Sequence, residues 1–141
     1  MHQQIKTSPG STDENLQAVI DTLGGAGINI QGIGPDFESP HIRTVVSHED
    51  TEAAISVLRS AGLEPEIRPG FTASVANRPG RLKHVLDALR QRGYGIESVL
   101  VLADRTGEDV LVSVGIDRPV PNDWVELGGF VIVEETHRRS E

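Results

Sequence analysis

Apolar residues recur along the chain with two different periods. Residues 16–23 and 82–89 place them at i, i+3, i+4 and i+7, which predicts two amphipathic helices, each with one buried face. Each helix runs into a glycine, Gly27 or Gly93, and then into a short apolar segment that predicts a strand. The two segments match at a constant offset of 66 residues without a gap. A helix, its terminal glycine and a strand repeated at one offset indicate an internal duplication.

The other predicted elements repeat in the same order. Each half reads as strand, helix, strand, strand, helix and strand, which is typical of the ferredoxin-like α+β sandwich. We therefore expect an α+β fold of two ferredoxin-like units, residues 1–68 and 69–141. Strands are expected at 3–7, 28–33, 42–47, 63–67, 71–75, 96–103, 110–116 and 130–134. Helices are expected from Ser11, Thr12 or Asp13 to Gly25, from Asp50 or Thr51 to Gly62, over 82–92 and, in degraded form, over 122–127.

Three predicted strands of the second unit are apolar at successive positions, at 99–102, 110–112 and 130–133. A strand with one buried face alternates apolar and polar residues, so these runs predict that both sheet faces are covered. The cover has to come from the other unit or from another chain. We expect at least a homodimer.

Composition excludes several classes of function. The chain has 141 residues, a net charge of -8, 4% aromatic residues and no cysteine. The acidic balance and the few aromatic side chains argue against nucleic acid as a partner. No apolar run is long enough to span a membrane and no secretory leader is visible, so we expect a cytoplasmic protein without a membrane partner.

The strongest chemical signal is the segment Asn77, Arg78, Pro79, Gly80, Arg81 and Leu82. It joins a predicted strand to a helix N-terminus, where unpaired backbone amides and the helix dipole favour an anion such as a carboxylate. Gly80 would let a ligand approach the backbone closely. Asparagine is also a good N-cap residue and proline suits the first helical turn, so capping alone is the competing interpretation.

Other chemistry is less well supported. Asp36, Glu38 and His41 lie close together in sequence and could bind a divalent cation, but we favour no metal site and no cofactor. No Ser–His–Asp arrangement or carboxylate pair stands out, so we expect a protein that is not an enzyme.

The segment 77–82, followed by Leu89, Gly93 and Ile96, resembles the signature of ACT domains, regulatory modules of amino-acid metabolism. Residues 27–30 and 42–47 of the first half are similar to the same family. The resemblance implies two tandem ACT units that pair side by side and bind an amino acid between them. In that family one unit supplies the strand-to-helix loop and the other an asparagine at the start of its second strand.

Carried over to this chain, the resemblance implies one complete composite site. The second unit keeps the loop, Asn77 to Leu82, and the first keeps Asn29, followed by Ile30 and Gln31. The reciprocal site is degenerate, because Ser11 and Thr12 replace the loop and Gly95 replaces the asparagine. The leading hypothesis is a non-catalytic sensor of an amino acid or a similar small carboxylate, with a regulated protein as a further partner. The alternative is a protein–protein interaction module without a ligand.

Overall fold

The computed structural model describes residues 3–7, 13–37, 39–76, 78–106, 109–121, 126–127 and 130–133, and this part of the chain is mixed α+β. Its helices are α1 (Asp13–Gly25), α2 (Thr51–Ser60) and α3 (Arg81–Gln91), with a 3-10 turn, η1 (His48–Asp50). Its strands are β1 (Gln3–Thr7), β2 (Ile30–Pro35), β3 (Ile42–Val46), β4 (Glu66–Ala76), β5 (Ile96–Thr106), β6 (Asp109–Ile116), β7 (Glu126–Leu127) and β8 (Phe130–Val133).

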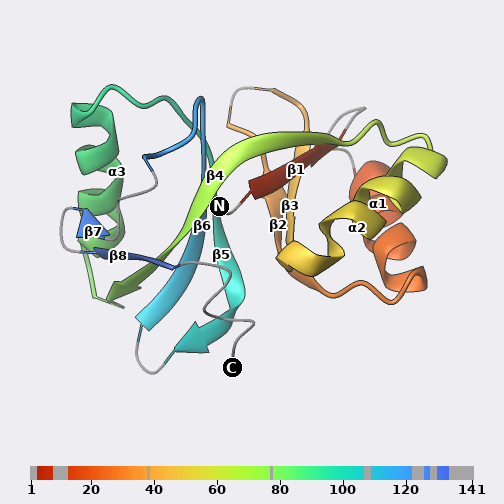
Figure 1. The fold of residues 1–141 in the computed structure, drawn as a ribbon, viewed down its shortest axis with the longest axis horizontal. Helices are drawn as coiled ribbons and strands as arrows, with labels where there is room; N and C mark the ends of the chain where they lie inside the picture. Colours follow the sequence, from red (N-terminus) through yellow and green to blue (C-terminus); the bar gives the residue numbers. More distant parts are fainter. Residues whose placement is uncertain are drawn as a thin grey trace.

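All described strand pairs are antiparallel. The hydrogen-bonded order is β2-β3-β1-β4-β6-β5, with β8 added to β4 and β7 to β8. The long strand β4 joins the two halves, because residues 66–69 pair with β1 and residues 70–76 pair with β6 (Figure 1).

Two predicted boundaries are corrected by the structure. The expected break at Pro69 and Gly70 is absent, and one strand runs through it. Pro69 is paired with Gln3 of β1, and the pairing of β4 with β6 begins only at Gly70. The missing amide hydrogen of Pro69 therefore costs the β4–β6 pairing no hydrogen bond. Glu126 and Leu127 form strand β7 and not the end of a helix, whereas residues 122–125 lie outside the described part.

The two halves share one hydrogen-bonded sheet through β4, and their sheet faces also meet. In Figure 1, α3 lies at the left, α1 and α2 lie at the right, and strands β1 to β6 lie between them. Leu100, Leu102 and Leu111 of the second half form a buried cluster with Val45 of the first. The apolar runs at 99–102 and 110–112 are therefore covered on one face from within the chain, whereas Val101 is 63% exposed.

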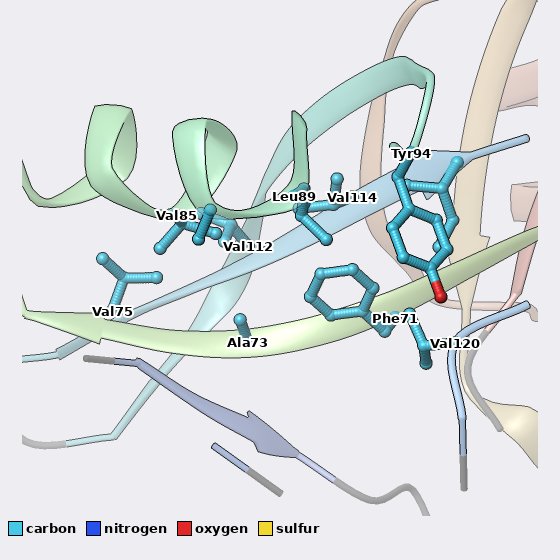
Figure 2. Close-up of a cluster of buried hydrophobic side chains, with 11 residues drawn as sticks. Phe71, Ala73, Val75, Val85, Leu89, Tyr94, Val112, Val114 and Val120 are labelled. Carbon is cyan, nitrogen blue, oxygen red and sulfur yellow. The ribbon is translucent and has the colours of Figure 1, made fainter. Parts of the chain in front are cut away.

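The helices cover the outer faces of the sheet. The α3 core holds Val85 and Leu89 against side chains of β4 and β6 (Figure 2). A separate core holds α1 and α2 against β1 and β3. The two helix ends also match: Ile28 N donates to Leu23 O at 2.9 Å, and Tyr94 N donates to Leu89 O at 3.1 Å, which are equivalent positions in the sequence repeat.

Candidate functional site

The predicted anion-binding loop leads from β4 into α3. Gly80 is the N-cap of the helix and has φ 86°, a left-handed conformation that favours glycine. A Cβ atom added there would meet no heavy atom within 4 Å. The backbone conformation, and not crowding, therefore requires glycine at this position.

The first turn of α3 presents backbone amides to the loop. The first i to i−4 hydrogen bond runs from His84 N to Gly80 O at 3.1 Å. The amides of Leu82 and Lys83 precede it, so they have no carbonyl of this helix to bond to. Arg78 and Pro79 are exposed, and Arg81 and Leu82 are half-buried. Asn77 lies outside the described residues. This end of the helix combines the backbone amides of the first turn, the positive end of the dipole and two guanidinium groups.

The other predicted half of the site lies at the start of β2. Asn29 is exposed, and Ile30 and Gln31 are half-buried. Gln31 occupies an irregularity in the pairing of β2 with β3, between Ile30 and Gly32. Its Oε1 atom is buried and accepts no hydrogen bond from the described residues. A buried acceptor without a donor suits a ligand that carries an N–H group.

One copy of the chain does not bring the two halves of the site together. In Figure 1 the loop before α3 follows the tip of β4 at the far left, whereas β2 lies in the right half of the molecule. Of the second, degenerate site, Ser11 and Thr12 lie outside the described residues. At Gly95 a Cβ atom would come within 2.9 Å of Asp117 Oδ2, so a carboxylate ligand there would meet a negative charge.

The seam between the two halves contains a buried ionic network that the sequence did not reveal. Arg43 of β3 is only 1% exposed. Its Nη2 lies 2.7 Å from Asp36 Oδ2 and 2.8 Å from Glu97 Oε1 of β5. Its Nη1 donates to Gln4 Oε1 at 3.2 Å. A single guanidinium of β3 therefore links Asp36, just after β2, to Gln4 of β1 and Glu97 of β5, which are far away in the sequence.

Glu97 is shared by two guanidinium groups. Arg68 of β4 donates to Glu97 Oε2 at 2.8 Å, beside the contact from Arg43. Burial by itself would raise the pKa of Glu97, but the hydrogen bonds from Arg68 and Arg43 outweigh it and hold the pKa below its usual value. The bond to Glu97 likewise raises the pKa of Arg68. Both groups stay charged at neutral pH.

Small side chains complete the network. Gln4 Nε2 donates to Ser113 Oγ at 2.9 Å, and Ser98 Oγ donates to Gln4 Oε1. A Cβ atom at Gly115 would lie 2.5 Å from Gln4 Oε1, so the amide of Gln4 fits only against glycine. The network holds the halves together and leaves little room for a ligand at the seam.

Two of the three residues of the alternative metal site make other contacts. Asp36 is committed to Arg43, and His41 Nδ1 lies 2.7 Å from Ser39 Oγ. Glu38 lies outside the described residues. Within the described ranges no group of three His, Asp or Glu side chains could hold a metal ion.

The ion pairs of Glu97 at the seam lead us to expect that the protein loses stability in acid. Folding lowers the pKa of Glu97. The ionised carboxylate therefore stabilises the folded protein above its unfolded-state pKa of about 4.3, and this stabilisation is lost as the pH falls through the lower pKa of the folded state. We expect the free energy of unfolding to fall from about pH 5 downward, and Glu97→Gln to flatten that fall. Urea titrations across this range measure it, with the exposed Glu52→Gln of α2 as the control. An unchanged acid profile in Glu97→Gln would show that the carboxylate does not couple to folding.

Comparison with known proteins identifies the fold. No family model and no curated protein matches the sequence. A Bacteroides thetaiotaomicron protein of known structure shares the fold with a TM-score of 0.64 and 22% identity, over 83% of this chain and 80% of that one. The ligand-free regulatory subunit of aspartate kinase from Thermus thermophilus gives 0.58 and 20%, over 82% and 81%. The Thermus flavus regulatory subunit gives 0.57 and 22%, over 82% of each chain.

These neighbours are consistent with an ACT-like fold. Two of them are regulatory subunits of aspartate kinase, and each match covers about four-fifths of both chains. Within the described residues no helix is long and apolar enough to cross a membrane.

Proposed function

We propose that this chain is a non-catalytic regulatory protein that binds an amino acid, or a similar small carboxylate, between two ACT-like units. The observation that carries the proposal is the fold shared with aspartate kinase regulatory subunits over about four-fifths of both chains. A regulatory subunit acts through a second protein, so a regulated protein partner belongs to the proposal. The cytoplasm, where amino-acid metabolism takes place, is the proposed location.

The two units of the proposal are residues 1–68 and 69–141, each ferredoxin-like, with β4 as the last strand of one and the first strand of the other. The strand orders β2-β3-β1-β4 and β5-β6-β4-β8 support it, because they match when the repeat is superimposed. The shared hydrogen-bond pattern after Leu23 and Leu89 supports it as well.

The ligand site of the proposal is composite and forms between two copies. Loop residues Asn77 to Leu82 of one copy would bind the carboxylate through the amides of the first turn of α3 and through Arg78. Asn29, Ile30 and Gln31 of the other copy would bind the amino group, with Gln31 Oε1 as an acceptor. Two copies are needed because one copy holds these segments far apart, and at least a homodimer is therefore proposed.

A thermal-unfolding screen of the common amino acids tests the proposal. A ligand that binds only the folded protein adds about 2.7 kcal/mol at a hundredfold excess over Kd. We expect one amino acid, or a small group of related ones, to raise Tm. The absence of any shift would contradict the proposal.

A glycine substitution then tests the loop. Gly80→Asp places a carboxylate at the proposed anion site and should abolish the shift in Tm caused by the ligand. Gly62→Asp is the matched control, because Gly62 also has a left-handed φ, 78°, and open space around it, but follows α2. Both variants carry the same backbone strain. If both variants lose the ligand-induced shift in Tm equally, the loop is not part of the binding site.

A second candidate function is an interaction module without a ligand. The observation in its favour is Val101, which is 63% exposed on β5, a strand with one described partner at the end of the sheet. An exposed apolar strand edge is a common docking element. A negative amino-acid screen together with strong self-association would favour this function.

A further inference from the structure

The side chain of Arg118 lies across the C-terminal end of α3. Its Nη1 atom donates to Gly93 O at 3.0 Å, and its Nη2 atom donates to Arg92 O at 3.4 Å. Its Cζ atom lies 4.1 Å from the centroid of the Tyr94 ring. Carbonyls at the negative end of a helix dipole and the face of an aromatic ring both attract a cation. The guanidinium of Arg118 therefore meets three groups that each favour its charge.

Asp117, the residue before it, fills the space beside Gly95. Asp117 N donates to Gly95 O at 3.0 Å, and a Cβ atom added at Gly95 would lie 2.9 Å from Asp117 Oδ2. Asp117 Oδ1 also lies 3.2 Å from Arg118 Nη1. Gly95 is the repeat counterpart of Asn29, at the offset of 66 residues. The space that a side chain has at Asn29 is therefore taken at Gly95 by a carboxylate.

The first half carries different residues at the matching positions. Strands β3 and β6 end at equivalent places in their registers with β2 and β5, so Ser47 and His48 are the counterparts of Asp117 and Arg118. Ser47 is the N-cap residue of η1 and leads the chain towards α2. Pro119 follows Arg118, and a residue before proline disfavours the helical conformation, so the chain enters no helix at this point. The acidic and basic pair belongs to the second half.

We propose that the end of α3 is a binding site for a guanidinium group and that Arg118 occupies it as a built-in ligand. With Asp117 it presents a cation and a carboxylate, the two kinds of charge that an amino acid carries, at the second of the two repeat-related positions. The pair closes that position to a free ligand and leaves Asn29–Gln31 as the open one. This consequence rests on the proposed function, whereas the guanidinium site itself does not.

Removal of the built-in ligand and addition of a free one test the site. Arg118→Ala vacates it without touching the core, because the side chain is 48% exposed. Tyr94 is the only tyrosine of the chain, so the NMR signal of a ring-labelled tyrosine reports on this site alone. We expect ethylguanidinium to shift that signal saturably in Arg118→Ala, in the millimolar range that suits an exposed cation on an aromatic ring. The wild-type signal should show no saturable shift, because Arg118 already fills the site.

Two controls separate binding at this site from a general effect of the added salt. Arg59→Ala removes the same charge from an exposed position on α2, so its tyrosine signal should respond to ethylguanidinium like that of the wild type. Ethylammonium should shift the Arg118→Ala signal much less. An ammonium group lacks the planar fork of donors with which a guanidinium contacts two carbonyls and stacks on a ring.

The guanidinium site is overturned if the Arg118→Ala signal shows no saturable shift, if it shifts no more than the wild-type signal, or if ethylammonium shifts it equally. None of these results depends on an amino acid. A protein whose Arg118→Ala variant binds ethylguanidinium, but whose Tm no amino acid raises, would keep this site and lose the proposed function. The reverse pair of results would keep the proposed function and lose only the built-in ligand.

Discussion

Replacing Arg43 with methionine should destabilise the protein by about 3–5 kcal/mol, because it removes one partner from a buried ionic network. Asp36 and Glu97 would lose the guanidinium that both contact. Among the described residues, Arg43 is the largest side chain that is fully buried. Arg68 also contacts Glu97, so that carboxylate would keep one guanidinium partner. Urea-induced unfolding measures the effect as a lower midpoint.

Arg59→Met is the control, because Arg59 is exposed on α2 and should change stability by less than about 0.5 kcal/mol. The double variant Arg43→Met with Asp36→Asn removes the buried charge from both sides, and we expect it to recover part of the loss. A cost for Arg43→Met no larger than for Arg59→Met would mean that the seam is not held by this network.

Replacing Gly115 with alanine should cost about 1–3 kcal/mol, because the seam has no space for a methyl group. The added carbon would lie 2.5 Å from Gln4 Oε1, 2.6 Å from Ser98 Oγ and 3.0 Å from Arg43 Nη1. These side chains are buried and hydrogen-bonded to one another, so they cannot move apart without loss of their bonds. Thermal unfolding should show a clear drop in Tm.

Gly24→Ala supplies the matched control for this alanine. Gly24 lies in α1 with no heavy atom within 4 Å of an added Cβ. Alanine should be neutral or stabilising there by up to about 1 kcal/mol, because glycine is a poor helix residue. Equal Tm values for the two variants would show that the halves pack more loosely than the seam implies.

Local patterns predicted the elements well, and the tertiary arrangement less well. The repeated helices and the strands after Gly27 and Gly93 follow from apolar periodicity, which depends only on neighbours in sequence. The apolar run at 99–102 correctly indicated that something covers the second sheet face, but not what. The pattern of apolar residues along a strand shows which of its faces are buried, but not which segment covers them. In the structure β4 carries one sheet from one half into the other, and Leu100, Leu102 and Val45 in addition bury a seam between the sheet faces.

The site was also only partly predictable. The helix start after Pro79 and Gly80 follows from local rules, and the structure places the N-cap at Gly80. Arg43 was missed because it stands among β-branched residues in a good strand pattern, and its partners are distant in sequence. The available signal was a lone charged residue inside a strand of β-branched residues, because burying an arginine is costly unless carboxylates pair with it.

Calorimetric titration of the wild-type chain with the amino acid that most raises Tm tests the central claim most directly. The account predicts saturable binding of one ligand per chain, because only one of the two repeated loops keeps the anion-binding sequence. The same titration should show binding abolished or strongly weakened in Asn29→Ala as well as in Gly80→Asp. Two ligands per chain, or binding that neither substitution changes, would contradict a composite site made from the loop before α3 and the start of β2.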